Sequence, residues 1–139
     1  MFSDLNQCSD EKLVELITMG NNDAFAALLT KHLSGAYQTA FKFLRSKEDA
    51  EDVTQDCFLK LWKSPQKFNP QLSIKFTTWF SHVIRNRSLD VLKKQREEIL
   101  NSDFDLEDDS KNQLHIIEEN LEKLRVEEAM EKLSEDQRK

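Results

Sequence analysis

Two neighbouring segments decide the fold of this chain: SKEDAEDVTQDCFLKLW at residues 46–62 and FNPQLSIKFTTWFSHVIRNRSLDVLKKQR at residues 68–96. In the first segment, Ser46 and Asp49 form a capping-box-like start. The acidic residues that follow suit the positive end of a helix dipole. This pattern predicts a helix that extends to about Lys63 and stops before the next proline.

The second segment opens with a turn and continues as a helix. A turn is predicted over residues 67–73, where Asn69-Pro70 interrupts regular structure. The helix is predicted from near Thr77 to beyond Arg96. Its apolar and basic residues recur at helical spacing, which indicates two different faces.

The N-terminal part is predicted to form two further helices. Ser9 can cap a short helix that Gly20 ends. Asn22 can cap a longer helix over residues 23–44, whose apolar residues cover more than one face. A helix of that kind is typically central and packs against two neighbours.

The C-terminal part begins with NSDFDLEDDS at residues 101–110, an acidic stretch without periodicity that predicts a flexible linker. A last helical stretch is predicted from about Asn112. We therefore expect an all-α fold: a compact bundle of about four helices, then an acidic linker and a C-terminal helical stub. The predicted divisions are a helical domain at 1–98, the linker at 99–111 and the helical segment at 112–139.

The charge is segregated along the chain. The net charge is −6, yet residues 60–96 hold nine basic residues and only Asp90 against them. Such a block predicts partners better than the net charge does, and it favours nucleic acid. No run approaches the roughly 20 apolar residues that cross a bilayer, so we expect a cytoplasmic chain without membrane insertion.

Metal binding and catalysis are not indicated. The two cysteines, Cys8 and Cys57, and three scattered histidines lack the spacing of a zinc site, so no metal or other cofactor is expected. Carboxylates such as Asp52 and Asp56 could bridge an ion, but no second group is spaced to complete a site. Phosphate-binding glycine loops and nucleophile motifs are missing, so we do not expect an enzyme.

A helical wheel of the second segment places cations opposite the apolar side. If the apolar side packs on the domain, the basic side faces a partner such as a phosphate backbone. Two interpretations of Phe76, Trp79 and Phe80 stay open at this point. They can form a stacking surface for unpaired bases beside these cations, or they can belong to the core while the cations are merely solvated. Phe80 is assigned to the core under either interpretation.

With these residues the sequence resembles a known family. DAEDVTQDCFLKLW at residues 49–62 closely resembles the core-polymerase-binding helix of bacterial sigma factors, with the extracytoplasmic-function group most similar. FTTWF at residues 76–80, then Ile84-Arg85-Asn86 and Asp90, is similar to the promoter-melting segment of that group. The resemblance covers roughly residues 9–98. Residues 126–138 resemble only the opening helix of the family's second domain, which indicates a truncated form.

The resemblance implies two sets of site residues. The helix that docks on the clamp helices of the largest subunit of core RNA polymerase corresponds here to Asp49, Glu51, Asp52, Gln55, Asp56, Phe58, Leu61 and Trp62. Phe58 and Leu61 can serve the domain core instead. Contacts to the non-template strand of the promoter minus-ten element are implied for Lys67, Asn69, Lys75, Phe76, Trp79, His82, Arg85, Asn86, Lys93 and Arg96.

The expected function is that of a transcription initiation factor that binds core RNA polymerase and recognises and melts the minus-ten element. An anti-sigma protein is a further expected partner. The alternative is a truncated helical interaction module that docks on polymerase or on an anti-sigma protein without independent promoter binding. The acidic linker resembles the family's connector through the polymerase cleft, and a plain solvated tether is the other interpretation.

Overall fold

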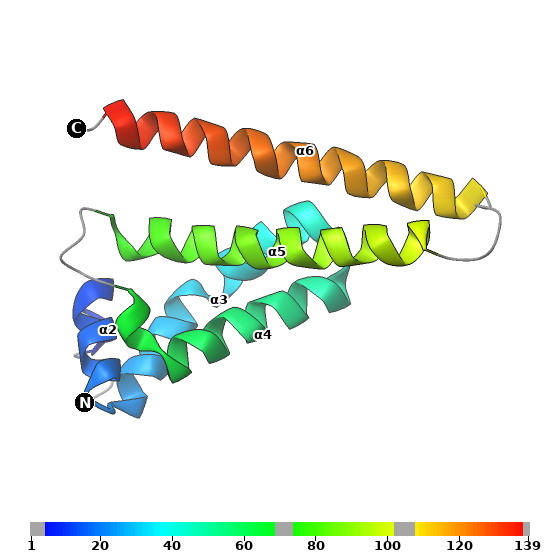
Figure 1. Cartoon of the computed structure of the whole chain (residues 1–139). Helices are drawn as coiled ribbons and strands as arrows, with labels where there is room; N and C mark the ends of the chain where they lie inside the picture. Colours follow the sequence, from blue (N-terminus) through cyan, green and yellow to red (C-terminus); the bar gives the residue numbers. More distant parts are fainter. Residues whose placement is uncertain (1–4, 69–73, 102–107, 138–139) are drawn as a thin grey trace.

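The computed structural model describes residues 5–68, 74–101 and 108–137. Every regular element along these residues is a helix, which confirms the all-α prediction (Figure 1). The elements are α2 (Asp10–Thr18), α3 (Asn22–Leu44), α4 (Lys47–Lys63), the short 3₁₀ helix η1 (Pro65–Lys67), α5 (Phe76–Leu100) and α6 (Asp108–Gln137).

The predicted helix starts hold at two positions and shift at a third. The Ser9 hydroxyl accepts from Lys12 N at 3.1 Å, and the Ser46 hydroxyl accepts from Asp49 N at 3.3 Å. The cap of α3 is Asn21, not Asn22, because its side chain accepts from Ala24 N at 3.0 Å. Both asparagines suit the role, and the sequence could not tell which one takes the extended backbone of a cap.

Gly20 ends α2 as predicted, with a left-handed φ of 91° that glycine adopts without a side-chain clash. Helix α3 ends at Arg45, which has a left-handed φ of 53° and donates its N–H to Phe41 O at 2.8 Å. Arg45 is the one described residue other than glycine with a positive φ. The chain therefore turns sharply between α3 and α4, so that the two helices pack side by side.

Helix α3 is central, as its apolar pattern predicted, and it contacts α2, α4, α5 and α6. One continuous core runs through the bundle, with Phe43, Phe76, Leu28 and Leu61 among its most buried side chains. Helix α2 also holds the start of α5, because Glu11 Oε1 accepts from Phe76 N at 3.3 Å. That bond satisfies one of the free N–H groups of the first helical turn.

The C-terminal helix is longer than predicted and does not stand apart as a stub. Helix α5 extends to Leu100 and α6 already begins at Asp108, so helix occupies both ends of the predicted linker. The middle of that stretch, residues 102–107, lies outside the described residues. Helix α6 runs back along α5 in the opposite direction and also contacts α3 (Figure 1). The division into separate domains stays a prediction.

Candidate protein and nucleic-acid interfaces

The acidic residues of α4 divide into two groups. Asp49 and Asp56 face α5, where Asp49 Oδ2 accepts from Gln95 Nε2 at 2.8 Å and Asp56 Oδ2 accepts from Arg87 at 3.1 and 3.2 Å. These contacts join α4 to α5. The remaining predicted docking residues on this face, Glu51, Asp52 and Gln55, are exposed. They lie on the surface of α4 together with exposed lysines such as Lys47 and Lys60.

An apolar groove lies beside these exposed residues, between α3 and α4. It consists of two adjoining hollows of about 510 and 540 Å³ that share Leu33 and Gln55. The apolar and aromatic residues that line it are Phe25, Leu29, Leu33, Tyr37, Phe58, Leu59 and Trp62. Leu33 is 46% exposed and Leu59 is 49% exposed. We call this surface the α3–α4 groove.

Most of the α3–α4 groove was not identified from the sequence as a site. Only Gln55, Phe58, Trp62 and Glu51 among its lining residues were predicted to bind a partner. One feature of the sequence did point to this groove: α3 carries more apolar residues than a single neighbouring helix can cover. Contiguous exposed apolar surface of this kind is typical of interaction sites.

Two predicted docking residues belong to the core. Phe58 is 4% exposed and Leu61 is 2% exposed, and the Phe58 ring lies 4.9 Å from that of Phe80. Leu61 is almost fully buried, and Phe58 lines the groove while nearly all of its surface is buried. Trp62, by contrast, is exposed and packs against Phe25 at 4.9 Å between ring centroids. The core assignment is therefore the right one for Leu61.

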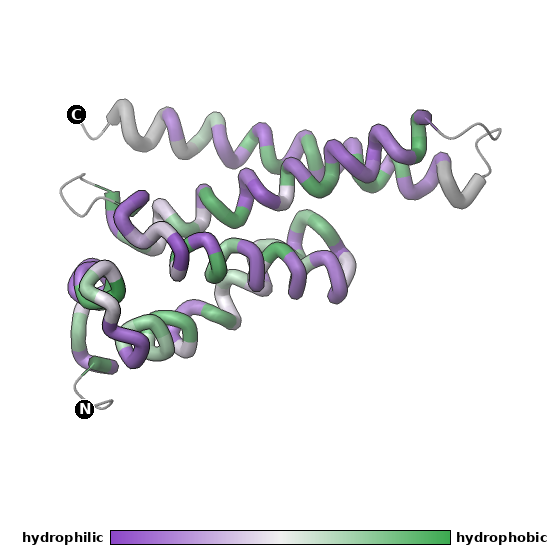
Figure 2. Tube along the Cα trace, turned by 60° about the horizontal axis from the view of Figure 1, so that its bottom comes forward, coloured by the Kyte–Doolittle hydropathy of each residue, from purple (hydrophilic) through white to green (hydrophobic). Residues whose placement is uncertain are grey.

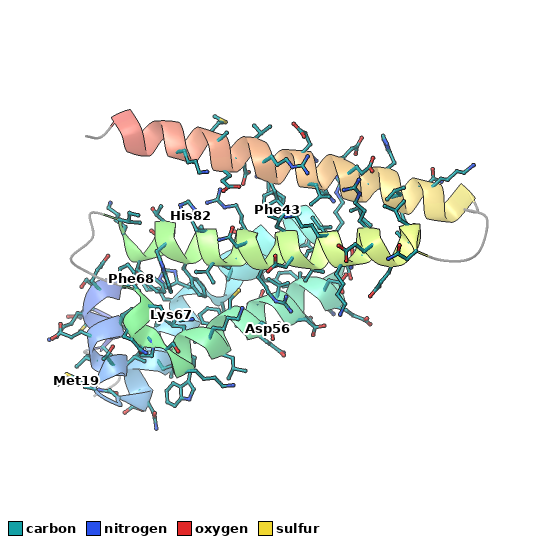
Figure 3. All side chains as sticks on the ribbon, in the orientation of Figure 1. Met19, Phe43, Asp56, Lys67, Phe68 and His82 are labelled. Carbon is teal, nitrogen blue, oxygen red and sulfur yellow. The ribbon has the colours of Figure 1, made fainter. Side chains whose placement is uncertain are left out.

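A cationic cleft lies on the other side of α4, between the end of that helix, η1 and α5. Its volume is about 220 Å³, and it is lined by Cys57, Lys60, Leu61, Ser64, Lys67, Trp79, Val83, Asn86, Arg87 and Asp90. Lys60, Lys67 and Arg87 bring three positive charges to it, against Asp90. Lys60 and Arg87 were not among the predicted site residues, although both lie in the basic block of the sequence. Figure 3 shows Lys67 at the end of α4 nearest the start of α5.

Cys57 lines the inner wall of this cationic cleft. Its thiol lies 4.0 Å from Val83 O, and burial raises its pKa to about 11. The thiol is therefore protonated at neutral pH and is a poor nucleophile. Cys57 is a small, buried core residue of α4.

The aromatic residues at the start of α5 separate into core and surface. Phe76 is fully buried at 0% exposure, and its ring lies within 5.3–5.4 Å of Phe68, Phe80 and His32. The prediction that Phe76 offers a stacking surface is wrong for this structure. Trp79 is half-buried, packs against Phe68 at 5.4 Å, and forms one wall of the cationic cleft. Trp79 is thus the residue of this group that a base could reach.

The basic face of α5 is not left open as the helical wheel suggested, because α6 lies along it. Arg85 is 6% exposed and faces Glu127 of α6 across 3.9 Å. His82, Arg85 and Asn86 line a small cleft of about 10 Å³ together with Leu89 of α5 and Leu124 and Glu128 of α6. Figure 3 places His82 on the side of α5 that faces α6. Only part of the predicted nucleic-acid face is therefore accessible.

The remaining predicted DNA-binding residues lie around these surfaces. Lys75 and Lys93 are exposed, Asn86 is exposed at the border of both clefts, and Arg96 faces Glu118 across 3.6 Å. Asn69 lies outside the described residues. Over the described part of the chain, no three His, Cys, Asp or Glu side chains are grouped to hold a metal ion. None of the helices described is both long and apolar enough to span a membrane.

Comparison with known proteins places about half of this chain in a known family. The family model for Sigma-70 region 2 matches residues 28–98, just over half of the chain. SigW of Bacillus subtilis, an ECF RNA polymerase sigma factor, is 26% identical over 86 residues, covering 62% of this chain and 45% of the relative. SigE of Mycolicibacterium smegmatis is 30% identical over 81 residues, covering 56% and 30%. No solved structure gives a significant match.

The matched segment contains the acidic face of α4, the cationic cleft and all of α5 except its last two residues. The chain belongs to the sigma-70 family, of which it carries region 2, and within it to the extracytoplasmic-function group. It spans between about a third and a half of the length of the curated relatives it matches, including the sigma-E factor of Haemophilus influenzae at 52%. Helix α6 lies beyond the match to region 2.

Proposed function

We propose that this chain acts as a transcription initiation factor that binds core RNA polymerase through α4 and engages the non-template strand of the promoter minus-ten element through α5. Membership of the sigma-70 family supports the first part. The cationic cleft carries the second part, because it combines Lys60, Lys67 and Arg87 with the ring of Trp79. In this scheme the chain performs no bond chemistry, and nucleotide addition belongs to the polymerase.

Polymerase docking is assigned to the exposed part of α4. Glu51, Asp52 and Gln55 form a polar edge, and the α3–α4 groove beside them offers an apolar surface. A partner helix with basic residues along one edge of an apolar stripe would match both features. The clamp helices of the largest polymerase subunit are the partner that the family resemblance implies. Apolar contact would supply affinity, while the charges would set orientation and association rate.

DNA engagement is assigned to the cationic cleft and to Asn86 at its border. A base that has left the duplex exposes a flat face and hydrogen-bonding edges, and its phosphates remain charged. The half-buried Trp79 can stack on the face, the Asn86 amide can bond to an edge, and Lys67 can neutralise a phosphate. Binding unstacked bases in this way offsets the few kcal/mol that unpairing costs.

A pull-down of purified core RNA polymerase tests the docking assignment. Asp52→Lys should abolish binding, because it reverses a charge at the polar edge of α4. Glu15→Lys, the same reversal on an exposed side chain of α2, should bind like the wild type. Circular dichroism should show equal helicity in all three proteins. Equal binding by the Asp52 variant, or no binding by the wild type, would overturn the assignment.

Salt-dependent binding of a labelled single-stranded minus-ten oligonucleotide tests the DNA assignment. Lys67→Ala should weaken binding and reduce the slope of log affinity against log salt by about 0.7, the value for one phosphate contact on a single strand. Lys12→Ala on α2 removes another exposed charge, from a residue that does not line the cleft, and should leave that slope unchanged. If both variants keep the wild-type slope, Lys67 does not contact the strand.

One observation favours the second candidate function, an interaction module without independent promoter binding. Helix α6 covers Arg85 and lies against His82 and Asn86, so part of the predicted DNA face is occupied. Such a chain would bind polymerase in the pull-down and fail to bind the oligonucleotide at any salt concentration. The two experiments together therefore separate the two functions.

A further inference from the structure

Helix α6 is held on α5 by an apolar seam. Ile117, Leu121 and Leu124 are spaced by four and three residues, which places them on one face of the helix, and all three are buried. Figure 2 shows hydrophobic and hydrophilic residues alternating along both helices where they lie side by side. The outer face of α6 includes the exposed Val126 and Met130. The seam thus positions one defined side of α6 against the bundle.

Acidic residues flank this seam and meet the cations of the bundle. Glu127 pairs with Lys42 of α3 and faces Arg85 of α5 across 3.9 Å. Glu118, which directly follows Ile117 of the seam, faces Arg96 of α5 across 3.6 Å. The sequence of α6 contains ten acidic and four basic residues, while α5 contains five basic and three acidic ones. Carboxylates of α6 therefore face Arg85 and Arg96, two cations of the predicted nucleic-acid face.

The contact between α6 and α5 also contains an unfavourable element. Asn120 lies within the seam at 1% exposure, and its amide nitrogen has no hydrogen-bond partner among the described residues. A buried donor without an acceptor loses its hydration and gains nothing in return. Two of the flanking charge pairs, at 3.9 and 3.6 Å, are longer than close ion pairs. The buried amide of Asn120 thus makes the packing of α6 weaker than an apolar side chain at that position would, and these two charge pairs add little to it.

We propose that α6 is an intramolecular competitor of nucleic acid, which covers the basic face of α5 and must leave before a strand can reach Arg85, His82 and Asn86 together. This inference rests on the proposed function and adds a regulated step to it. Helix α6 belongs to the same chain as α5, so its effective concentration near α5 is high. Even a weak contact between the two helices therefore lowers the apparent affinity for DNA. The apparent affinity equals the intrinsic affinity multiplied by the fraction of molecules in which α6 is displaced.

Two substitutions should shift this equilibrium in opposite directions. Glu127→Gln removes the carboxylate that faces Lys42 and Arg85, so it should favour the open form and raise the affinity for a labelled single-stranded oligonucleotide about three- to ten-fold. Asn120→Leu replaces the unsatisfied amide with an apolar group, so it should favour the closed form and lower the affinity by a similar factor.

Glu119→Gln is the matched control. It makes the same charge change on α6, but Glu119 is exposed and pairs with His115 within that helix. Its effect should stay within about two-fold, since it alters only the net charge. Circular dichroism on each variant comes first. Glu127 is partly exposed, so its substitution leaves the core intact and keeps the test valid if Asn120→Leu fails to fold.

Hydrogen exchange with and without the oligonucleotide reports on α6 directly. We expect the amides around Leu121 and Leu124 to lose protection when DNA binds, because α6 leaves α5. The inference is overturned, and the proposed function kept, if α6 stays protected in the DNA complex or if Glu127→Gln and Glu119→Gln raise affinity equally. If no variant binds the oligonucleotide even at low salt, the inference and the DNA assignment are both wrong.

Discussion

The α3–α4 groove is open to solvent, whereas the basic face of α5 is covered by α6 around Arg85. In the groove, Leu33 stays 46% exposed, while on the other side Arg85 is 6% exposed. A leucine is thus accessible and an arginine buried, which reverses the usual preference of both residue types. The difference arises because α6 packs on α5 and no described segment packs over the groove.

This contrast shows what an amphipathic helix does and does not reveal. The pattern of a helix tells which residues share a side, but any side can be covered by a segment that comes later in the chain. Helix α6 is acidic and carries an apolar seam, so it suits a basic face that also has apolar residues such as Leu89 and Leu92. The α3–α4 groove is lined by one cation, Lys47, and one carboxylate, Glu51, so its lining offers this acidic helix no comparable group of cations.

The largest expected effect concerns the aromatic core between the two faces. Phe76→Ala removes a fully buried ring and leaves a cavity next to Phe68 and Phe80, so it should lower the free energy of unfolding by about 3–5 kcal/mol. Urea denaturation followed by circular dichroism measures it. Trp62→Ala, at the exposed end of the groove, should cost no more than about 1.5 kcal/mol. If both variants lose the same free energy of unfolding, Phe76 is not part of the core in solution.

A pair of leucine substitutions compares the covered and the open surface directly. Leu121→Ala in the seam should cost about 2–4 kcal/mol, since the side chain is 2% exposed. Leu33→Ala in the α3–α4 groove should cost less than about 1 kcal/mol, because that side chain already contacts water. Urea denaturation gives both values. Should the two substitutions cost the same, α6 would not be packed on α5 in solution.

A pH titration tests the contact that holds α2 to α3 beneath the same aromatic core. Burial alone would raise the pKa of the Asp10 carboxyl, but Lys31 at 2.8 Å and His32 at 3.0 Å outweigh it and hold the pKa below its ordinary value of 3.8. A lowered pKa stabilises the folded state above the unfolded-state value, and this stabilisation is lost as the pH falls through the folded-state pKa.

Asp10→Asn should therefore be less stable than the wild type by about 1–2 kcal/mol at neutral pH. The difference should shrink as the pH falls below about 3.8. Thermal denaturation at several pH values measures it, and Glu15→Gln on the exposed side of α2 serves as the control. A difference that persists unchanged at low pH would show that the charge of Asp10 is not its cause.

The smallest effect is expected for the ion pair that joins α4 to α5 at the edge of the cationic cleft. Asp56 and Arg87 are partly exposed, so a double-mutant cycle with alanine should give a coupling energy of about 0.2–1 kcal/mol. Added salt should reduce the coupling, because exposed charges are screened. A coupling energy that does not change with salt would indicate that this ion pair is more buried than the structure shows.

Local features of the fold were predictable because they depend on neighbouring residues. Ser46 caps α4, Gly20 ends α2, and Cys57 lies on an apolar stripe, all of which follow from spacing within one helix. The exposure of Glu51 and Asp52 on α4 was predictable for the same reason. The assignments to polymerase and DNA stay predictions, since no contact within the chain tests them.

Other assignments depended on how helices meet. Phe76 and Trp79 are three residues apart at the start of α5, yet one is fully buried and the other lines a cleft. Phe68, Phe80 and His32 come from different segments and together enclose Phe76. Spacing within α5 could not distinguish the two aromatic residues, because their exposure is set by those neighbours.

The sequence by itself determined the helical class, the main helix starts and the separation of charge between α4, α5 and the C-terminal part. These features follow from capping, periodicity and composition, which act over a few residues. Only the tertiary structure decided that α6 covers Arg85, that the α3–α4 groove stays open, and that Lys60 and Arg87 join Lys67 around Trp79. Those outcomes depend on which helix faces pack together, and packing joins residues that are far apart in the chain.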